Sequence, residues 1–144
     1  MEVPKGIKGM AGRLWFLLPL LLAACGEAAP PAHLRVAGGD AERGRAAILA
    51  AGCATCHAIP GIPAVRGMVG PPLDGFAGRT YIGGVLPNTP SYLVAWLRDP
   101  PAFAPGTAMP NTGLDADAAR DIAAYLYTLG PPGAPPPGGL WGGR

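Results

Sequence analysis

Cys53-Ala54-Thr55-Cys56-His57 carries the strongest structural signal in this chain. Two cysteines separated by two residues and followed at once by a histidine form the C-x-x-C-H pattern of covalent haem attachment. With this spacing the two thiols reach neighbouring vinyl groups of a haem and add to them as thioethers. His57 then lies beneath the iron and supplies one axial nitrogen. The motif predicts a single haem c, an iron cofactor, attached covalently through Cys53 and Cys56.

A redox or zinc-binding C-x-x-C that precedes a histidine by chance is the alternative. Structural zinc is held by four ligands, usually with a second ligand pair, and the remaining cysteine, Cys25, lies in a segment of different character. With two cysteines assigned to haem and one placed elsewhere, none is left to form a disulfide.

The first residues are typical of an export signal. Lys5, Lys8 and Arg13 precede an apolar run over 14–24, and that run is shorter than the roughly 20 residues needed to span a bilayer. A basic stretch followed by a short apolar stretch predicts a signal peptide over residues 1–24. Met10 would serve as the start of such a signal as well as Met1.

Cys25 follows directly after this signal. Leu22-Ala23-Ala24-Cys25 resembles the lipobox of bacterial lipoproteins, a family in which the chain is cut before the cysteine and the cysteine carries the lipid. We therefore expect lipidation at Cys25 and a location on the extracytoplasmic face of a bacterial membrane, which is also the periplasmic side where haem c is attached. An ordinary signal peptide with an unrelated cysteine and an uncleaved anchor are the alternatives.

The charge pattern excludes a nucleic-acid-binding function. The formal net charge is +2, but from Gly26 onward the chain has eight arginines, no lysine and eight acidic residues. Nucleic-acid binding would need a clustered basic face. With 23 glycines and 19 prolines, much of the backbone must be loop. A small, loop-rich domain buries little apolar surface by itself, so an attached haem would supply much of its core.

Composition and periodicity divide the chain into four parts. After the signal peptide we expect a lipid-attachment and flexible linker segment over 25–38, a folded domain over 39–130, and a Pro/Gly-rich tail over 131–144. Three helices are expected in the domain. They run from about Asp40 to Ala51, from Thr89 to Asp99, and from Asp115 to Gly130, each with an N-cap residue.

The haem iron also needs a sixth ligand or an open position. His33 lies in the linker and is a poor candidate, which leaves Met68 and Met109. Met68 follows His57 too closely to cross easily to the opposite face of the haem. Met109 lies in the Pro-rich loop 105–110 between two predicted helices and is the expected ligand, since His/Met ligation is typical of electron-transfer cytochromes c. The alternative is a five-coordinate iron.

The domain resembles class I cytochromes c along its whole length. Gly70 to Arg79, GPPLDGFAGR, is similar to the family's G-P-x-L-x-G-x-x-G-R stretch. This resemblance implies an all-α class I cytochrome c fold with three main helices and long loops around the haem. It also implies that the Pro71 carbonyl accepts the Nδ1 proton of His57, that Leu73 packs on the haem, and that Arg79 lies near a propionate.

A second resemblance concerns the cytochrome c domain of haem-copper oxidase subunit II. The stretches over 84–90, GVLPNTP, and over 96–100, WLRDP, are similar to that group. The resemblance implies that Asn88 and Trp96 line the haem pocket near the propionates.

These expectations describe a monomeric electron carrier rather than an enzyme, because both axial positions of the iron would be filled. A membrane respiratory enzyme is the expected partner, with a terminal cytochrome oxidase as the acceptor. One alternative is a haem subunit that accepts electrons from a periplasmic dehydrogenase. A weak bond from Met109 would instead favour a haem sensor or a peroxidatic haem.

Overall fold

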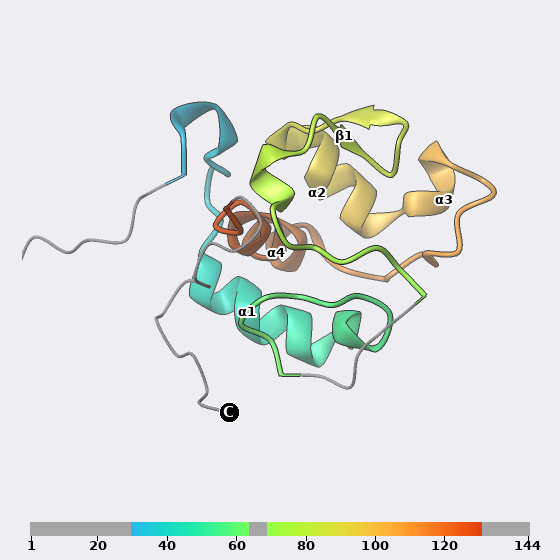
Figure 1. Ribbon diagram of the computed structural model, residues 1–144, viewed down its shortest axis with the longest axis horizontal. Helices are drawn as coiled ribbons and strands as arrows, with labels where there is room; N and C mark the ends of the chain where they lie inside the picture. Colours follow the sequence, from blue (N-terminus) through green and yellow to red (C-terminus); the bar gives the residue numbers. More distant parts are fainter. Residues whose placement is uncertain (1–29, 64–68, 131–144) are drawn as a thin grey trace, which may run out of the picture.

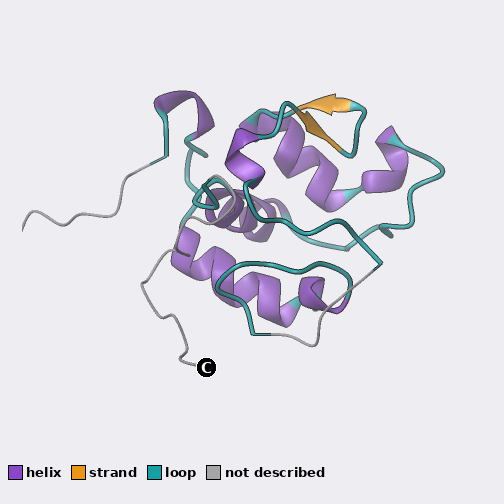
Figure 2. Ribbon diagram, in the orientation of Figure 1, coloured by secondary structure: helices purple, strands orange, loops and turns teal. Residues whose placement is uncertain are grey.

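The computed structural model of the chain describes residues 30–63 and 69–130. Helices and long loops make up nearly all of these residues (Figures 1 and 2). The helices are α1 (Ala41–Ala50), α2 (Pro90–Arg98), α3 (Pro100–Phe103) and α4 (Ala116–Leu126), and the strands are β1 (Tyr81–Ile82) and β2 (Leu86–Pro87). No helix within the described ranges combines the length and apolar character needed to cross a bilayer. The predicted signal peptide, Cys25, Met68 and the predicted tail lie outside these ranges.

The starts of the long helices agree with the sequence patterns. The Asp40 carboxylate accepts a hydrogen bond from the backbone N–H of Arg43 at 2.8 Å, and the Asp115 carboxylate accepts one from Ala118 at 2.7 Å. Both aspartates therefore satisfy an amide that the first helical turn leaves unpaired. Thr89 precedes α2, but its side chain makes no bond to the backbone of the first turn.

The end of α4 differs from the prediction. The helix stops at Leu126, before the expected end at Gly130. The amide of Thr128 bonds to the carbonyl of Tyr125 at 2.9 Å, and that of Leu129 to Leu126 at 3.1 Å. These shorter i→i+3 bonds tighten the last turn before the chain reaches glycine, so Gly130 does not serve as the C-cap.

The first and last long helices, α1 and α4, cross in close contact. A Cβ atom on Gly44 of α1 would lie 2.0 Å from the carbonyl oxygen of Asp121 in α4. Only glycine leaves room for the two backbones at this separation. The crossing brings together residues from the two ends of the domain and fixes the start of α1, and with it the motif that follows α1.

A buried carboxylate reinforces this crossing. Asp121 is only 7% exposed and accepts the backbone N–H of Asp40 at 2.8 Å. It also accepts Nε of Arg43 at 2.7 Å and Nη2 of Arg43 at 2.8 Å. Hydrogen bonding from the Arg43 guanidinium holds the pKa of the Asp121 carboxyl below its usual range. The charged form of Asp121 therefore contributes to the stability of the fold.

We expect Asp121→Asn to lower the free energy of unfolding by roughly 1–3 kcal/mol at pH 7, because the substitution weakens charge-assisted hydrogen bonds at a buried position. Since folding lowers the pKa of Asp121, the contribution is present above the unfolded-state pKa of about 4 and is lost as the pH falls through the folded-state value. Denaturant unfolding from pH 7 to pH 3 should therefore show the two proteins converging in stability at the acidic end.

Asp117→Asn is the matched control on the same helix. Asp117 pairs with Arg120, but its side chain is 86% exposed, and exposed pairs contribute little. Equal losses from the two substitutions would contradict the role given to Asp121.

The packed part of the chain begins before Gly39. A 3₁₀ helix spans Ala32–Leu34, and the Leu34 side chain is buried in the core. Residues 30–38, which we expected to be a flexible linker, therefore contact the domain at Leu34. An apolar side chain buried at one position is enough to overcome the Pro-rich composition around it.

Two elements were not predicted. The strands β1 and β2 form an antiparallel hairpin in which Tyr81 pairs with Pro87 and Ile82 with Leu86, and α3 follows directly after α2. The hairpin covers α2, because a Cβ atom on Gly83 would lie 2.4 Å from Cη2 of Trp96. Strands of two residues are too short to give an alternating pattern in the sequence.

Candidate haem attachment site

The C-x-x-C-H motif forms a single tight turn directly after α1. Gly52 has a positive φ of 67° and turns the chain out of the helix, a conformation that glycine adopts without strain. Cys53 begins a 3₁₀ helix that ends at Thr55. The amides of Cys56 and His57 both bond to the Cys53 carbonyl, at 3.2 and 3.0 Å. The motif is therefore held as one rigid unit by the packed helix before it.

Both thiols are free and partly buried. Burial raises the pKa of the Cys53 thiol. Within residues 30–63 and 69–130, no three His, Cys, Asp or Glu side chains come together as ligands for a metal ion. The geometry therefore gives no support to the zinc alternative in the described part of the chain.

The His57 ring is held in one orientation. Its Nδ1 lies 2.8 Å from the carbonyl oxygen of Pro71, which is the contact implied by the family resemblance. A carbonyl only accepts, so Nδ1 carries the proton and Nε2 is left with a free lone pair. A Cβ atom on Gly70 would lie 2.3 Å from Cε1 of the same ring. His57 thus has the tautomer of an iron ligand, and Gly70 provides the space for the ring.

The loop that carries Pro71 is fastened to the motif on both sides. The amide of Gly70 bonds to the carbonyl of Cys56 at 2.8 Å, and the amide of Leu73 bonds to that of Ala58 at 2.8 Å. In the view of Figure 1 this loop crosses the molecule between the α1 side and the α2–α3 side. Its two backbone bonds fix the position of the Pro71 carbonyl relative to His57.

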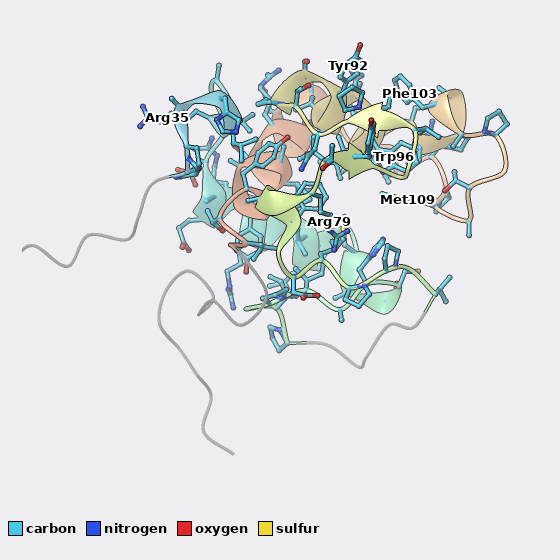
Figure 3. All side chains as sticks on the ribbon, turned by 45° about the horizontal axis from the view of Figure 1, so that its top comes forward. Arg35, Arg79, Tyr92, Trp96, Phe103 and Met109 are labelled. Carbon is cyan, nitrogen blue, oxygen red and sulfur yellow. The ribbon has the colours of Figure 1, made fainter. Side chains whose placement is uncertain are left out.

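Arg79 is directed toward the same loop. Its Nη2 donates to the carbonyls of Pro72 and Asp74, and its guanidinium lies over the Phe76 ring, 5.4 Å from the centroid. In Figure 3 Arg79 lies toward the middle of the molecule, between the two sides that the loop separates. Arg79 therefore clamps the loop, in addition to being the expected partner of a propionate.

The side chain of Asn88 forms its hydrogen bonds with other groups of the protein. Its Nδ2 donates to the carbonyls of Phe76 and Arg79, each at 3.0 Å, and its Oδ1 accepts the hydroxyl of Tyr127 at 3.0 Å. An amide nitrogen has two hydrogens, and both are used. The Asn88 side chain therefore has no hydrogen left to donate to a propionate. Its place near the propionates stays a prediction, without a hydrogen bond from its amide nitrogen.

Met109 lies in the loop between α3 and α4, and its side chain is partly buried against the core. Its amide bonds to Oγ1 of Thr107 at 3.2 Å. The loop is tied to the end of α2, because Thr112 Oγ1 donates to the carbonyl of Leu97 at 2.5 Å. Figure 3 shows Met109 on the same side of the molecule as Trp96. The thioether is therefore carried by a tethered loop.

Side chains from three separate segments around the motif share one property: they are apolar and only partly covered by protein. They are Cys53, Leu73 and Met109. Trp96, by contrast, is 8% exposed and packs beneath the hairpin. Half-covered apolar groups, two free thiols and a histidine with a free Nε2 are what a covalently bound haem requires. The residues present therefore fit this cofactor.

Three segments that form the site contain no charged residue. Residues 46–63, 69–73 and 100–114 contain no Asp, Glu, Lys or Arg. They include the attachment motif, the Pro71 loop and the Met109 loop. Exposed apolar side chains also occur there, with Leu49 at 44% and Val69 at 73% exposure. Arg79 is thus a charged member of the site, beside segments that are themselves uncharged.

The sequence model of the cytochrome c family matches residues 41–130. The chain belongs to the cytochrome c family. Cytochromes c hold haem c covalently and transfer electrons, so the predicted cofactor and the predicted all-α cytochrome c fold are confirmed. The Cys53-x-x-Cys56-His57 motif fits the covalent attachment of this cofactor.

Two proteins that resemble this chain are an oxidase subunit and a cytochrome c. One is a cytochrome c oxidase subunit 2 from Alkalihalophilus pseudofirmus, 32% identical over 90 residues, which are 62% of this chain and 25% of the relative. The chain thus spans about a quarter of that protein. The other is a cytochrome c from Tetrahymena pyriformis, 33% identical over 99 residues, covering 63% of this chain and 90% of the relative. A crystal structure of cytochrome c2 from Rhodobacter sphaeroides aligns with a TM-score of 0.48 at 22% identity, over 65% of this chain and 98% of that one.

Sequence reasoning missed two features of this cytochrome c site. Tyr127 lies within the predicted range of the last helix and was not assigned to the site, although its hydroxyl bonds to Asn88. The structural reason for Gly70, which is contact with the His57 ring, was also not foreseen. A glycine next to the predicted partner of the histidine was a usable signal for close approach.

Proposed function

We propose that this cytochrome c is a lipid-anchored monohaem electron carrier on the outer face of a bacterial membrane, delivering single electrons to a terminal cytochrome oxidase. The observation that carries the proposal is His57, whose Nδ1 is bonded to the Pro71 carbonyl at 2.8 Å while Nε2 is free. Cys53 and Cys56 hold the haem, His57 and Met109 bind its iron, and the iron supplies a one-electron couple between the ferrous and ferric states.

The protein groups assigned to this site hold and shield rather than react. Pro71 keeps the His57 ring in one tautomer, Leu73 covers the haem, and Arg79 lies close to the loop that borders it. Met109 brings a soft thioether, which favours the ferrous state. His57 and Met109 would both bind the iron, which would leave it no open position for a substrate, as an electron carrier requires.

Two observations support an oxidase as the partner. A relative named as a cytochrome c oxidase subunit contains a segment 32% identical to this chain. Three segments that form the site carry no charged residue, while Leu49 and Val69 are exposed there. An uncharged, apolar surface suits docking by burial of apolar area. The lipid on Cys25 would keep carrier and membrane enzyme together, with an effective concentration that approaches the millimolar range.

Electron transfer from the reduced protein to membrane vesicles containing a cytochrome oxidase tests this partner. We expect the rate to change less than about threefold between 20 and 500 mM salt, because steering by charge is weak for an uncharged docking surface. Oxidation by the vesicles should stop with an oxidase inhibitor. A steep fall of the transfer rate with salt would show that the docking site includes the arginines. If a periplasmic dehydrogenase reduces the protein and the oxidase does not oxidise it, the proposed direction of electron flow is wrong.

Cys25→Ser tests the anchor. Several acyl chains, each gaining about 0.8 kcal/mol per buried methylene, give stable attachment to a membrane. The variant should therefore be found in the soluble fraction or left unprocessed, with an unchanged haem spectrum and slower electron transfer at equal total protein. Mass spectrometry of the wild-type N-terminus should identify a lipidated Cys25, and any other mature N-terminus would contradict the lipoprotein prediction.

A further inference from the structure

Tyr127 lies just beyond the end of α4, and its ring is almost fully buried, at 2% exposure. Its hydroxyl donates to Oδ1 of Asn88 at 3.0 Å, and burial raises the pKa of this hydroxyl, so it remains a donor. The hydroxyl thus pairs with the oxygen end of the Asn88 amide. The amide nitrogen must then point the other way.

The Asn88 amide nitrogen connects Tyr127 to the turn that carries Arg79. It donates to the carbonyls of Phe76 and Arg79, each at 3.0 Å. Those two carbonyls border the 3₁₀ helix Phe76–Gly78. Reversal of the amide would place an oxygen against both carbonyls. The two carbonyls therefore fix the orientation of the amide, and the Tyr127 hydroxyl holds Asn88 in place by donating to Oδ1.

A second contact joins the same residues through their side chains. The rings of Tyr127 and Phe76 pack with centroids 5.9 Å apart and planes tilted by 55°. The Arg79 guanidinium lies 5.4 Å from the centroid of the Phe76 ring. Tyr127 thus supports the backbone of Arg79 through Asn88 and the side chain of Arg79 through Phe76.

Arg79 transmits this support to the loop beside the histidine. Its Nη2 donates to the carbonyls of Pro72 and Asp74. Pro72 is the neighbour of Pro71, whose carbonyl lies 2.8 Å from Nδ1 of His57. Hydrogen bonds and packed side chains therefore run without a break from Tyr127 to the loop that orients the histidine ring.

We propose that Tyr127 and Asn88 are positioning residues for His57: they fix Arg79, which fixes the loop, which keeps the Pro71 carbonyl against Nδ1. This inference rests on the proposed function, in which His57 binds the haem iron. Such an outer contact tunes a metal ligand through the strength of its hydrogen bond. The specific consequence is that loss of one distant hydroxyl weakens a hydrogen bond at the histidine.

The test compares wild-type holoprotein with Tyr127→Phe, which removes only the hydroxyl and keeps the ring against Phe76. The measurement is the exchange rate of the His57 Nδ1 proton in the reduced protein, followed by NMR. Since a neutral hydrogen bond of ordinary strength is lost from the support of the loop, we expect exchange roughly fivefold faster. Asn88→Ala should speed exchange at least as much, and the double variant should be no faster than Asn88→Ala alone, because the two residues act as one unit.

Two controls separate positioning from a general loss of stability. Tyr92→Phe removes a hydroxyl from a side chain that is 43% exposed, and should leave the exchange rate unchanged. Asp121→Asn destabilises the domain at the α1–α4 crossing, away from the loop. Any increase in its exchange rate should therefore match the increase in its equilibrium constant for unfolding.

Each outcome decides one question. If exchange in Tyr127→Phe is unchanged, or rises only in step with the loss of global stability as in Asp121→Asn, the positioning role is wrong. If the wild-type spectrum shows no iron-bound histidine with a protected Nδ1 proton, the proposed function fails instead.

Discussion

Replacing both Cys53 and Cys56 with alanine should leave a chain that retains no haem and does not fold. The matched domain is only about 90 residues long, and a domain of this size buries a modest fraction of its apolar surface by itself. Cys53, Leu73 and Met109 are only partly covered by protein. Without the attached haem, these groups face water and the long loops have nothing to pack against.

Two measurements check this expectation. In the wild type, haem should remain with the polypeptide after denaturation and extraction with acid acetone, and in the double variant none should. Far-ultraviolet circular dichroism of the double variant should show most of the helix signal lost, since native domains are stable by only about 5–15 kcal/mol with all their contacts in place. Thr55→Ala, a change inside the motif that keeps its spacing, should behave like wild type. Free extraction of haem from the wild type would contradict covalent attachment.

Met109→Ala should open the iron and lower the reduction potential sharply. A thioether favours the ferrous state, and its loss leaves water or a harder ligand in the sixth position. Axial ligands set haem potentials over a range of about 0.8 V, so a fall of roughly 0.1–0.3 V is expected. The reduced variant should bind carbon monoxide, whereas the reduced wild type should not.

Met68→Ala is the matched control for this ligand, because Met68 is the other methionine considered from the sequence. It should change neither the potential nor the binding of carbon monoxide. If Met68→Ala opens the iron and Met109→Ala does not, the two assignments must be exchanged. Binding of carbon monoxide to the wild type itself would favour the sensor or peroxidatic alternative.

Local sequence signals predicted the long helices well. Asp40 and Asp115 cap their helices as expected, because an N-cap depends on a short side chain and the next few residues only. The predicted end of α4 was wrong. Tighter hydrogen bonds close the last turn before Gly130, and the glycine alone did not indicate them. The hairpin over 81–87 could not be predicted, because strands of two residues are too short to show an alternating pattern.

Long-range contacts could be anticipated only where a family resemblance supplied them. The bond between His57 and Pro71 joins residues 14 positions apart, and nothing in the spacing alone specifies it. Burial of Leu34 could not be inferred from its Pro-rich surroundings, because burial depends on where the rest of the domain lies. The bond between Asn88 and Tyr127 was not anticipated for the same reason, because the two residues lie 39 positions apart.

The crossing of α1 and α4 also determines where the chain enters and leaves the domain. The stretch that precedes α1 lies on the left in Figure 1, and Met109 lies on the right in Figure 3, a view turned about the horizontal axis. Further polypeptide joined before α1 would therefore begin on the side of the molecule away from Met109. The same fold is thus suited to be used as an independent domain, either attached to a lipid or joined to a larger protein by gene fusion.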